Sequence, residues 1–174
     1  PERLPRQEDR VGIAIELARR NIANHTGGPF GAAVFDGAGR LLAPGVNLVV
    51  PWSCSILHAE MVALALAQRR LGRYDLSAGG SSTYELCAST EPCAMCFGAI
   101  PWSGVTRLVC GARDEDARAA GFDEGPKLAD WPGALIARGI EVVRDVLRDE
   151  AADVLRRYAE AGGLIYNARG TRTP

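Results

Sequence analysis

Two short clusters of side chains in this sequence have the residue types and spacing of a metal site. His58 and Glu60 form a His-x-Glu pair, while Cys93 and Cys96 follow Pro92 with Cys-x-x-Cys spacing. One imidazole and two thiolates suit a tetrahedral zinc ion and leave its fourth position open for water. Four protein ligands would make a closed structural site, and no further His or Cys pair completes one. The set therefore predicts one catalytic Zn²⁺ per chain.

Glu60 lies two residues beyond His58, where it is better placed to carry protons than to bind the metal. Its carboxylate could take a proton from water and return it to a substrate. A single His-x-Glu pair is weak evidence, and a single Cys-x-x-Cys pair is moderate evidence. The two pairs together, with Pro92 before the first cysteine, form a specific pattern. A structural zinc is the alternative, and the presence of Glu60 argues against it.

The composition is that of one ordinary globular domain over residues 1–174, with 47% hydrophobic and 24% charged residues. The apolar runs are too short to span a bilayer, and no secretion signal is visible. We therefore expect a cytoplasmic protein with no membrane partner. Twenty basic and twenty-one acidic side chains give a net charge of −1. This balance is poor for holding a polyphosphate chain, so no nucleic-acid partner is expected.

The five cysteines are an odd number and argue against a disulfide framework. Cys87 and Cys110 lie inside apolar stretches and are interpreted as core residues. Cys54 lies four residues before His58, and either packing or a place in a pocket wall would explain it.

The pattern of apolar residues places both clusters at the starts of helices. Helices are predicted at 8–24, 58–70, 93–101 and 149–161, and strands at 30–35, 41–50, 83–89, 105–112 and 139–147. Pro44-Gly45 indicates a bulge or an edge position in the second strand. The helices that begin at His58 and after Pro92 would direct two positive dipole ends at one point, which favours thiolates.

The connection between the fourth and fifth strands spans about 27 residues and contains helix-like segments at 114–120 and 131–138. A parallel pair of strands needs a crossover of a dozen residues or more, whereas an antiparallel pair needs only a hairpin. We therefore predict that these two strands are parallel, in a sheet with helices on both faces.

With these motifs the chain resembles the cytidine-deaminase-like superfamily, and within it the bacterial guanine deaminases. The resemblance covers most of the chain, from the Gly-Pro-Phe-Gly-Ala motif at 28–32 to the Ala-Gly-Phe-Asp-Glu motif at 120–124. It implies a three-layer α/β/α sandwich with a five-stranded mixed sheet, one catalytic zinc and a homodimer. It also implies parallel fourth and fifth strands, in agreement with the connection length, whereas cytidine deaminases proper have a hairpin there.

The resemblance implies several substrate-binding residues as well. Asn47 stands where the family places an amide that hydrogen-bonds the base, and an amide offers both a donor and an acceptor. Phe30 and Trp102 match aromatic residues of the base pocket, although core packing would explain such residues equally well. Ala59, between His58 and Glu60, is counted with this group.

Glu124 matches a second acidic residue of the family, and it bears on the choice of substrate. Guanine presents two donors, N1–H and the exocyclic amine, on the edge that is attacked. A second carboxylate would accept from them and could pass a proton to departing ammonia, whereas it would repel the acceptor N1 of adenine. The predicted reaction is hydrolysis of the C2 amino group of guanine to give xanthine and ammonia. Without the resemblance, Glu124 would be interpreted as an exposed loop acid.

Three other functions stay open at this point. An aminotriazine such as ammeline, or a guanine nucleoside, shares the N–C(NH₂)–N unit of guanine. A tRNA adenosine deaminase would need a positive groove around the pocket, which the charge balance disfavours. A non-catalytic zinc or dimerisation module would not need Glu60.

The tail at 163–174 contains the apolar run Leu164-Ile165-Tyr166. This arrangement resembles that of guanine deaminases, which close the pocket with C-terminal residues, in some cases from the partner subunit. We therefore predict that the tail folds over the zinc site with Tyr166 near the base. The alternative is that Ile165 and Tyr166 only cover an edge of the core.

Overall fold

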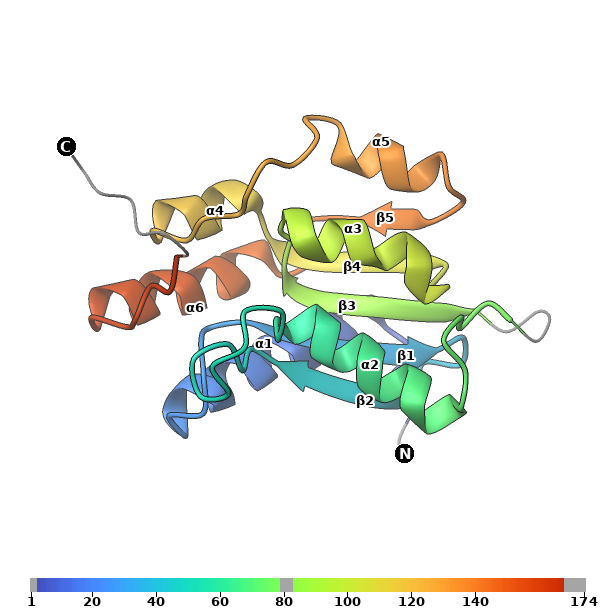
Figure 1. Ribbon diagram of the computed structural model, residues 1–174, viewed down its shortest axis with the longest axis horizontal. Coiled ribbons are helices and arrows are strands. Elements are labelled where there is room, and N and C mark those ends of the chain that lie inside the picture. The colour runs from blue at the N-terminus through green and yellow to red at the C-terminus, as the bar shows by residue number, and fades with distance from the viewer. Residues whose placement is uncertain (1–2, 79–82, 168–174) are drawn as a thin grey trace.

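The computed structural model describes residues 3–78 and 83–167 of the chain, and it contains a five-stranded sheet between two layers of helices (Figure 1). The strands are β1 (Gly31–Asp36), β2 (Leu41–Val46), β3 (Tyr84–Thr90), β4 (Arg107–Ala112) and β5 (Glu141–Val143). The helices are α1 (Gln7–Ala23), α2 (Ala59–Leu71), α3 (Ala94–Ser103), α4 (Asp114–Ala119), α5 (Trp131–Ile136) and α6 (Arg148–Glu160).

The sheet is mixed, with the strand order β2-β1-β3-β4-β5. Strand β1 is antiparallel to both β2 and β3, whereas β3, β4 and β5 run parallel to one another. The parallel pairing of β4 with β5 confirms the prediction from connection length, because α4 and α5 together provide the crossover. The carboxyl ends of β3 and β4 consequently lie at the same edge of the sheet.

Alternating side chains of the strands fill two separate cores. On one face, Val34 and Leu86 pack with residues of α2, α3 and α5. On the other face, Phe35 and Cys87 pack with residues of α1, α4 and α6. Figure 1 shows α2 and α3 in front of the sheet and α1 and α6 behind it. The predicted α/β/α sandwich is therefore confirmed, and the central strands β1, β3 and β4 bury both of their faces, as their apolar composition requires.

Two strands end earlier than the sequence pattern predicts. Strand β2 ends at Val46, because the chain turns there into the loop that leads to α2. Strand β5 covers only three residues instead of 139–147, since Asp145 and Leu147 adopt positive φ angles of 65° and 55°. Such angles are incompatible with extended backbone. The prediction for β5 was therefore wrong in length, although its place in the sheet was correct.

Pro44-Gly45 lies in β2, which is an edge strand as predicted, while the irregularity in the register falls between Val34 and Phe35 of β1. Gly45 has a packing role: a Cβ there would lie 2.2 Å from the backbone oxygen of Ala59. The start of α2 can approach the sheet this closely only because residue 45 has no side chain.

Within the residues described, none of the helices is both long and apolar enough to cross a membrane.

Candidate metal centre and substrate pocket

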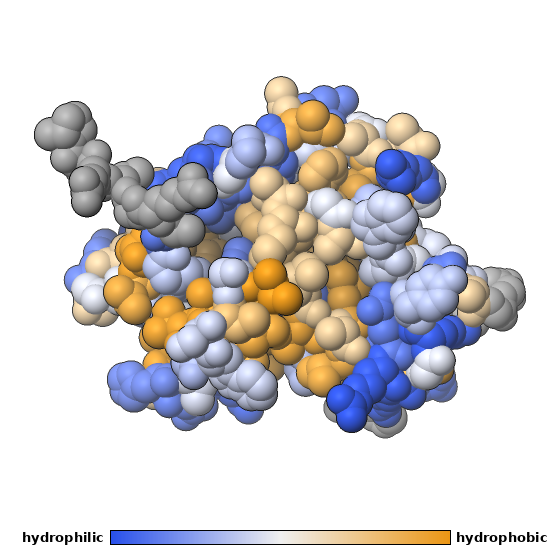
Figure 2. Space-filling view, in the orientation of Figure 1, coloured by the Kyte–Doolittle hydropathy of each residue, from blue (hydrophilic) through white to orange (hydrophobic). Residues whose placement is uncertain are grey.

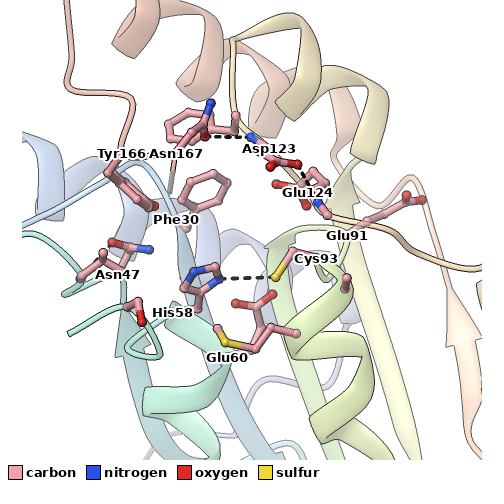
Figure 3. A pocket seen from close by; sticks show the side chains of 16 residues that line it. Phe30, Asn47, His58, Glu60, Glu91, Cys93, Asp123, Glu124, Tyr166 and Asn167 are labelled. Carbon is pink, nitrogen blue, oxygen red and sulfur yellow. Dashed lines mark hydrogen bonds between the residues drawn. The ribbon is translucent and has the colours of Figure 1, made fainter. Parts of the chain in front are cut away.

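The three predicted metal ligands lie together at the starts of α2 and α3. His58 and Cys93 are the N-cap residues of these helices, both with extended backbone, and Cys96 lies in the first turn of α3. Nδ1 of His58 is 3.4 Å from Sγ of Cys93 (Figure 3). The same nitrogen is 3.7 Å from Sγ of Cys96. The ligand atoms of the three residues all lie within 4.8 Å of one another.

These distances fit a tetrahedral zinc ion. With Zn–N near 2.0–2.1 Å and Zn–S near 2.3 Å, tetrahedral angles place N and S about 3.6 Å apart. A hydrogen bond from Cys96 lowers the pKa of Cys93 to about 4; burial opposes this shift, and His58 assists it. One thiolate is therefore available for a metal at neutral pH before the metal binds. The geometry and the donor set thus both suit zinc with one open position.

Glu60 lies in the first turn of α2 and is buried beside the three ligands. Burial, together with the charge of Cys93, raises its pKa to about 7, although His58 acts in the opposite direction. A carboxyl group with a pKa near neutrality can both accept and donate a proton at physiological pH. This property suits the proton carrier that the sequence predicts.

Glu124 reaches the same pocket from the loop after α4, and its side chain is only 5% exposed. Burial raises its pKa to about 8, with further contributions from the charges of Cys93 and Glu60. The backbone oxygen of Glu124 accepts a hydrogen bond of 2.9 Å from the backbone N–H of Ala94, the first residue of α3. The loop is therefore fastened directly to the helix that carries the two cysteines.

The side chains of Phe30, Asn47 and Tyr166 close the pocket opposite the two acids (Figure 3). The pocket has a volume of about 290 Å³. Asn47 is 1% exposed, and its Oδ1 accepts a hydrogen bond of 3.2 Å from the backbone N–H of Val49. Its Nδ2 has no hydrogen-bond partner among the residues that the structure describes. A buried, unpartnered amide donor at the wall of a pocket is suited to an acceptor atom of a ligand.

The beginning of the C-terminal tail also forms part of the pocket. The ring of Tyr166 packs edge-on against Phe122, with 5.6 Å between ring centroids, and Phe122 in turn packs against Phe30 at 4.8 Å. Gly28 makes room for Tyr166, since a Cβ at this glycine would lie 2.9 Å from the Tyr166 ring. Asn167 donates to the backbone oxygen of Gly121 at 2.9 Å. Residues 168–174 of the predicted lid lie outside the described residues.

The structure does not bring every predicted residue to the pocket. Trp102 is 80% exposed on α3 and lies outside the pocket lining of the single chain. Ala59 is buried between His58 and Glu60 and does not line the pocket either. Cys54 is half-buried and also lies outside the lining.

Sequence reasoning missed several other residues of the pocket. Glu91, Phe122, Asp123 and Asn167 all line it. Glu91 stands directly before Pro92, and an acid next to a metal motif is a signal that could have been used. Asp123 accepts one hydrogen bond, from the backbone N–H of Gly125 in its own loop, and its backbone N–H donates to Oδ1 of Asn167. It therefore shapes the loop that carries Glu124.

The family model of the cytidine and deoxycytidylate deaminase zinc-binding region matches residues 5–112. Among curated proteins, guanine deaminase of Bacillus subtilis is 38% identical over 112 residues, which cover 64% of this chain and 67% of that protein. The tRNA-specific adenosine deaminase of Haemophilus influenzae is 39% identical over 152 residues, covering 87% and 82% of the two chains.

Solved structures extend the similarity to the whole fold. A guanine deaminase from Nitrosomonas europaea is 52% identical, with a TM-score of 0.88 over 92% of this chain and 88% of that one. A protein solved in complex with 2,6-diaminopurine is 54% identical, with a TM-score of 0.90 over 97% of this chain and 89% of that one.

Proposed function

The chain belongs to the cytidine and deoxycytidylate deaminase family, and from this premise we propose that it hydrolyses guanine to xanthine and ammonia. It is a zinc-dependent hydrolytic deaminase, since it combines the zinc-binding region of the family with a His/Cys/Cys group. The similarity to guanine deaminases supports the choice of base. The arrangement of acidic and amide groups in the pocket supports it independently.

In the proposed site, His58, Cys93 and Cys96 hold the metal. When bound there, zinc would supply a hydroxide nucleophile at neutral pH. Glu60 takes the proton released from the attacking water and passes it to a ring nitrogen next to C2. The pKa of Glu60, raised to about 7, lets one group accept and then donate at the same pH.

The observation that carries the choice of guanine is the second buried carboxyl, Glu124. Guanine presents N1–H and the C2 amine at the reacting edge, and a carboxylate is an acceptor for both. With a pKa near 8, Glu124 can also exist as the acid that protonates the leaving amine. On the opposite side, Nδ2 of Asn47 offers its free N–H to an acceptor atom of the base. We assign Phe30 and Tyr166 to the walls that enclose the flat faces of the base.

A tRNA substrate is the second candidate, because tRNA-specific adenosine deaminases are among the relatives. The pocket lining argues against it. Four acidic side chains line the pocket, and none of the described lining residues is Lys or Arg. A polyphosphate strand needs cations at the mouth of the site, whereas a neutral free base does not. The volume of about 290 Å³ is also at the small end for ligand pockets.

The substrate is tested by measuring ammonia release from guanine, guanosine, ammeline, cytosine and a tRNA anticodon stem with the zinc-loaded protein. We expect turnover of guanine to exceed that of the others. Glu124→Gln should lower guanine turnover while the fold is retained, and the exposed Glu160→Gln is the matched control. If the protein turns over the tRNA stem, ammeline or guanosine faster than guanine, that compound replaces guanine as the proposed substrate. Normal guanine turnover by Glu124→Gln would remove the role of Glu124.

We further propose that the protein acts as a homodimer. Figure 2 shows apolar side chains gathered on the face formed by α2 and α3. Trp52, Ile56, Leu66 and Trp102 are large apolar residues exposed on these helices and on the loop before α2. A second copy covering this face would bury them. Light scattering of the protein and of Trp102→Glu tests this, with a dimer expected for the first and a monomer for the second.

A further inference from the structure

Lys127 is the single lysine among the twenty basic side chains of the sequence, and it lies next to the segment that carries the metal ligands. Its side chain is 6% exposed. The ammonium group donates to the backbone oxygen of Pro92 at 2.9 Å and lies 2.8 Å from Oδ1 of Asp114. It also stands 5.0 Å from the centre of the Trp131 ring. Pro92 immediately precedes Cys93, so this cation contacts the metal segment directly.

The surroundings of Lys127 suit a lysine better than an arginine. An ammonium group is compact and has three donors, whereas a guanidinium is a larger planar fork. Here a backbone oxygen, a carboxylate and an aromatic face surround one nitrogen atom. The guanidinium of Arg144 already lies 5.6 Å from the same Trp131 ring and donates to Glu91 at 2.6 Å. A second guanidinium would have to share this space.

The loop from Glu124 to Lys127 is hydrogen-bonded to the residue directly before Cys93 and to the residue directly after it. At one end, the backbone oxygen of Glu124 accepts from the N–H of Ala94, which follows Cys93. At the other end, Lys127 donates to the oxygen of Pro92, which precedes Cys93. Arg118 of α4 also donates to the backbone oxygen of Gly125 in this loop at 3.0 Å, but it does not contact the metal segment. The bonds of Glu124 and Lys127 are the two that fix the loop relative to Cys93.

We propose that Lys127 is a positioning residue that sets the placement of the Glu124 carboxyl relative to Cys93. It does so by holding the loop of Glu124 and the segment of Cys93 together, without touching the substrate. This inference rests on the proposed function, because the role of Glu124 there is proton transfer to the leaving amine. The same bond to Pro92 restrains the segment that supplies a thiolate to the metal.

A purely structural role for Lys127 would affect folding alone, and the chain offers a matched control. Arg10 is also a buried cation, 11% exposed, and its Nε lies 2.6 Å from Oε1 of Glu85. Glu85 stands near the start of β3, whereas the metal segment follows the end of that strand. Lys127→Met keeps the length of the side chain and leaves Asp114 paired with Arg118 at 2.5 Å. Folding of this variant should therefore be retained.

The first test compares Lys127→Met with Arg10→Met in melting temperature, zinc release to a chelator, and kcat and KM for guanine. We expect Lys127→Met to lower kcat and to speed zinc release by about tenfold each, with KM little changed, as removal of partners around metal ligands does. Arg10→Met should lower the melting temperature and leave zinc release and kcat as they are. Unchanged zinc release and kcat in Lys127→Met would overturn the proposal.

The second test places Lys127→Met in a Glu124→Gln background. If Lys127 acts through Glu124, the double variant should have a kcat within about twofold of that of Glu124→Gln alone, and a full multiplicative loss would overturn the proposal. Zinc release reports on Lys127 without reference to any substrate. If the wild type is inactive on guanine but Lys127→Met still releases zinc faster, the proposed substrate is wrong. The contact between Lys127 and the metal segment is then still supported.

Discussion

At the scale of single residues, the pocket concentrates negative charge where water is largely excluded. Burial raises the pKa of both Glu60 and Glu124, and the charge of Cys93 raises each of them further. Such a group of acids and thiolate is unfavourable by itself and is stabilised by a bound cation. Burial, and after it these charges, bring both carboxyls to pKa values near neutrality, where they can exchange protons.

The assignment of the metal ligands predicts different results for two cysteines. Cys96→Ser should lose zinc, because its thiol lies 3.7 Å from the His58 nitrogen and within the ligand group. Cys54→Ser should retain one zinc per chain, since Cys54 lies outside this group and outside the pocket lining. Metal analysis of the purified variants measures both. Full zinc content in Cys96→Ser would remove this residue from the site.

Glu60→Gln should keep zinc and lose most turnover. The amide has nearly the same shape as the carboxyl but cannot accept and return a proton. General acid–base catalysis contributes about 10²–10⁴-fold, and we expect a loss of kcat within or above this range. Steady-state kinetics, together with zinc analysis, check the prediction. A loss of less than about tenfold would mean that another group carries the proton.

Motif spacing was enough to predict the grouping of His58, Cys93 and Cys96, because the helix starts that place them follow from local sequence. Lys127 was not predicted, since its role depends on how a long crossover folds back onto Pro92. Its only sequence signal is that it is the single lysine. The orientation of Trp102 could not be predicted from the sequence either. Cys96, Ile100 and Ser103 define the buried face of α3, and Trp102 points away from it.

At the scale of elements, two helix starts and two loops form the site. The N-termini of α2 and α3 carry the metal ligands, the loop after α4 carries Glu124, and the loop after β2 carries Asn47. Asn21 in α1 stabilises the last of these, since its Nδ2 donates to the backbone oxygens of Gly28 and Asn47 at 2.9 Å each. Element types and order could be predicted from periodicity, whereas the early end of β5 depends on backbone angles that periodicity does not report.

The sequence left open whether the tail closes the pocket or only covers the core, and two substitutions separate these alternatives. Ile165 packs against the core formed with α1 and α6, whereas Tyr166 also lines the pocket. Ile165→Ala should lower the melting temperature by the loss of buried methylenes, with little change in KM. Tyr166→Ala should raise KM for guanine or lower kcat, because water then enters the pocket beside the base. Melting temperatures and steady-state kinetics of both variants measure these effects. If the two variants have the same kcat and KM, the tail serves only to cover the core.

At the scale of the whole molecule, chemistry and structural stabilisation lie at opposite ends of β3. The pocket follows its carboxyl end, and a cluster of ionic side chains surrounds Glu85 near its start. Both Arg10 and Arg107 form ion pairs with Glu85, and Arg107 also pairs with Glu141 at 3.0 Å. This cluster joins α1, β3, β4 and β5 at the end of the sheet remote from the metal ligands. It therefore contributes to folding without belonging to the pocket.

The Glu85 cluster predicts how stability depends on pH. Burial alone would raise the pKa of Glu85, but hydrogen bonds from Arg10, Cys87 and Arg107 lower it below the ordinary value of 4.5. A carboxyl whose pKa is lower in the folded state than in the unfolded state stabilises the fold above its unfolded pKa. That contribution should be fully present at neutral pH and lost as the pH falls below about 4.5 through the folded pKa.

Melting temperatures between pH 7 and pH 3 for the wild type, Glu85→Gln and Glu160→Gln test this dependence. Glu85→Gln leaves the nearly buried guanidinium of Arg10 without its carboxylate, whereas Arg107 keeps its pair with Glu141, so the variant should be destabilised at neutral pH by about 3 kcal/mol. Its difference from the wild type should shrink below pH 4.5, because the wild-type carboxyl becomes protonated there. Glu160 forms an exposed i,i+4 pair with Arg156, and its variant should follow the wild-type curve. A constant difference between wild type and Glu85→Gln at all pH values would show that the ionised form of Glu85 is not what stabilises this end of the sheet.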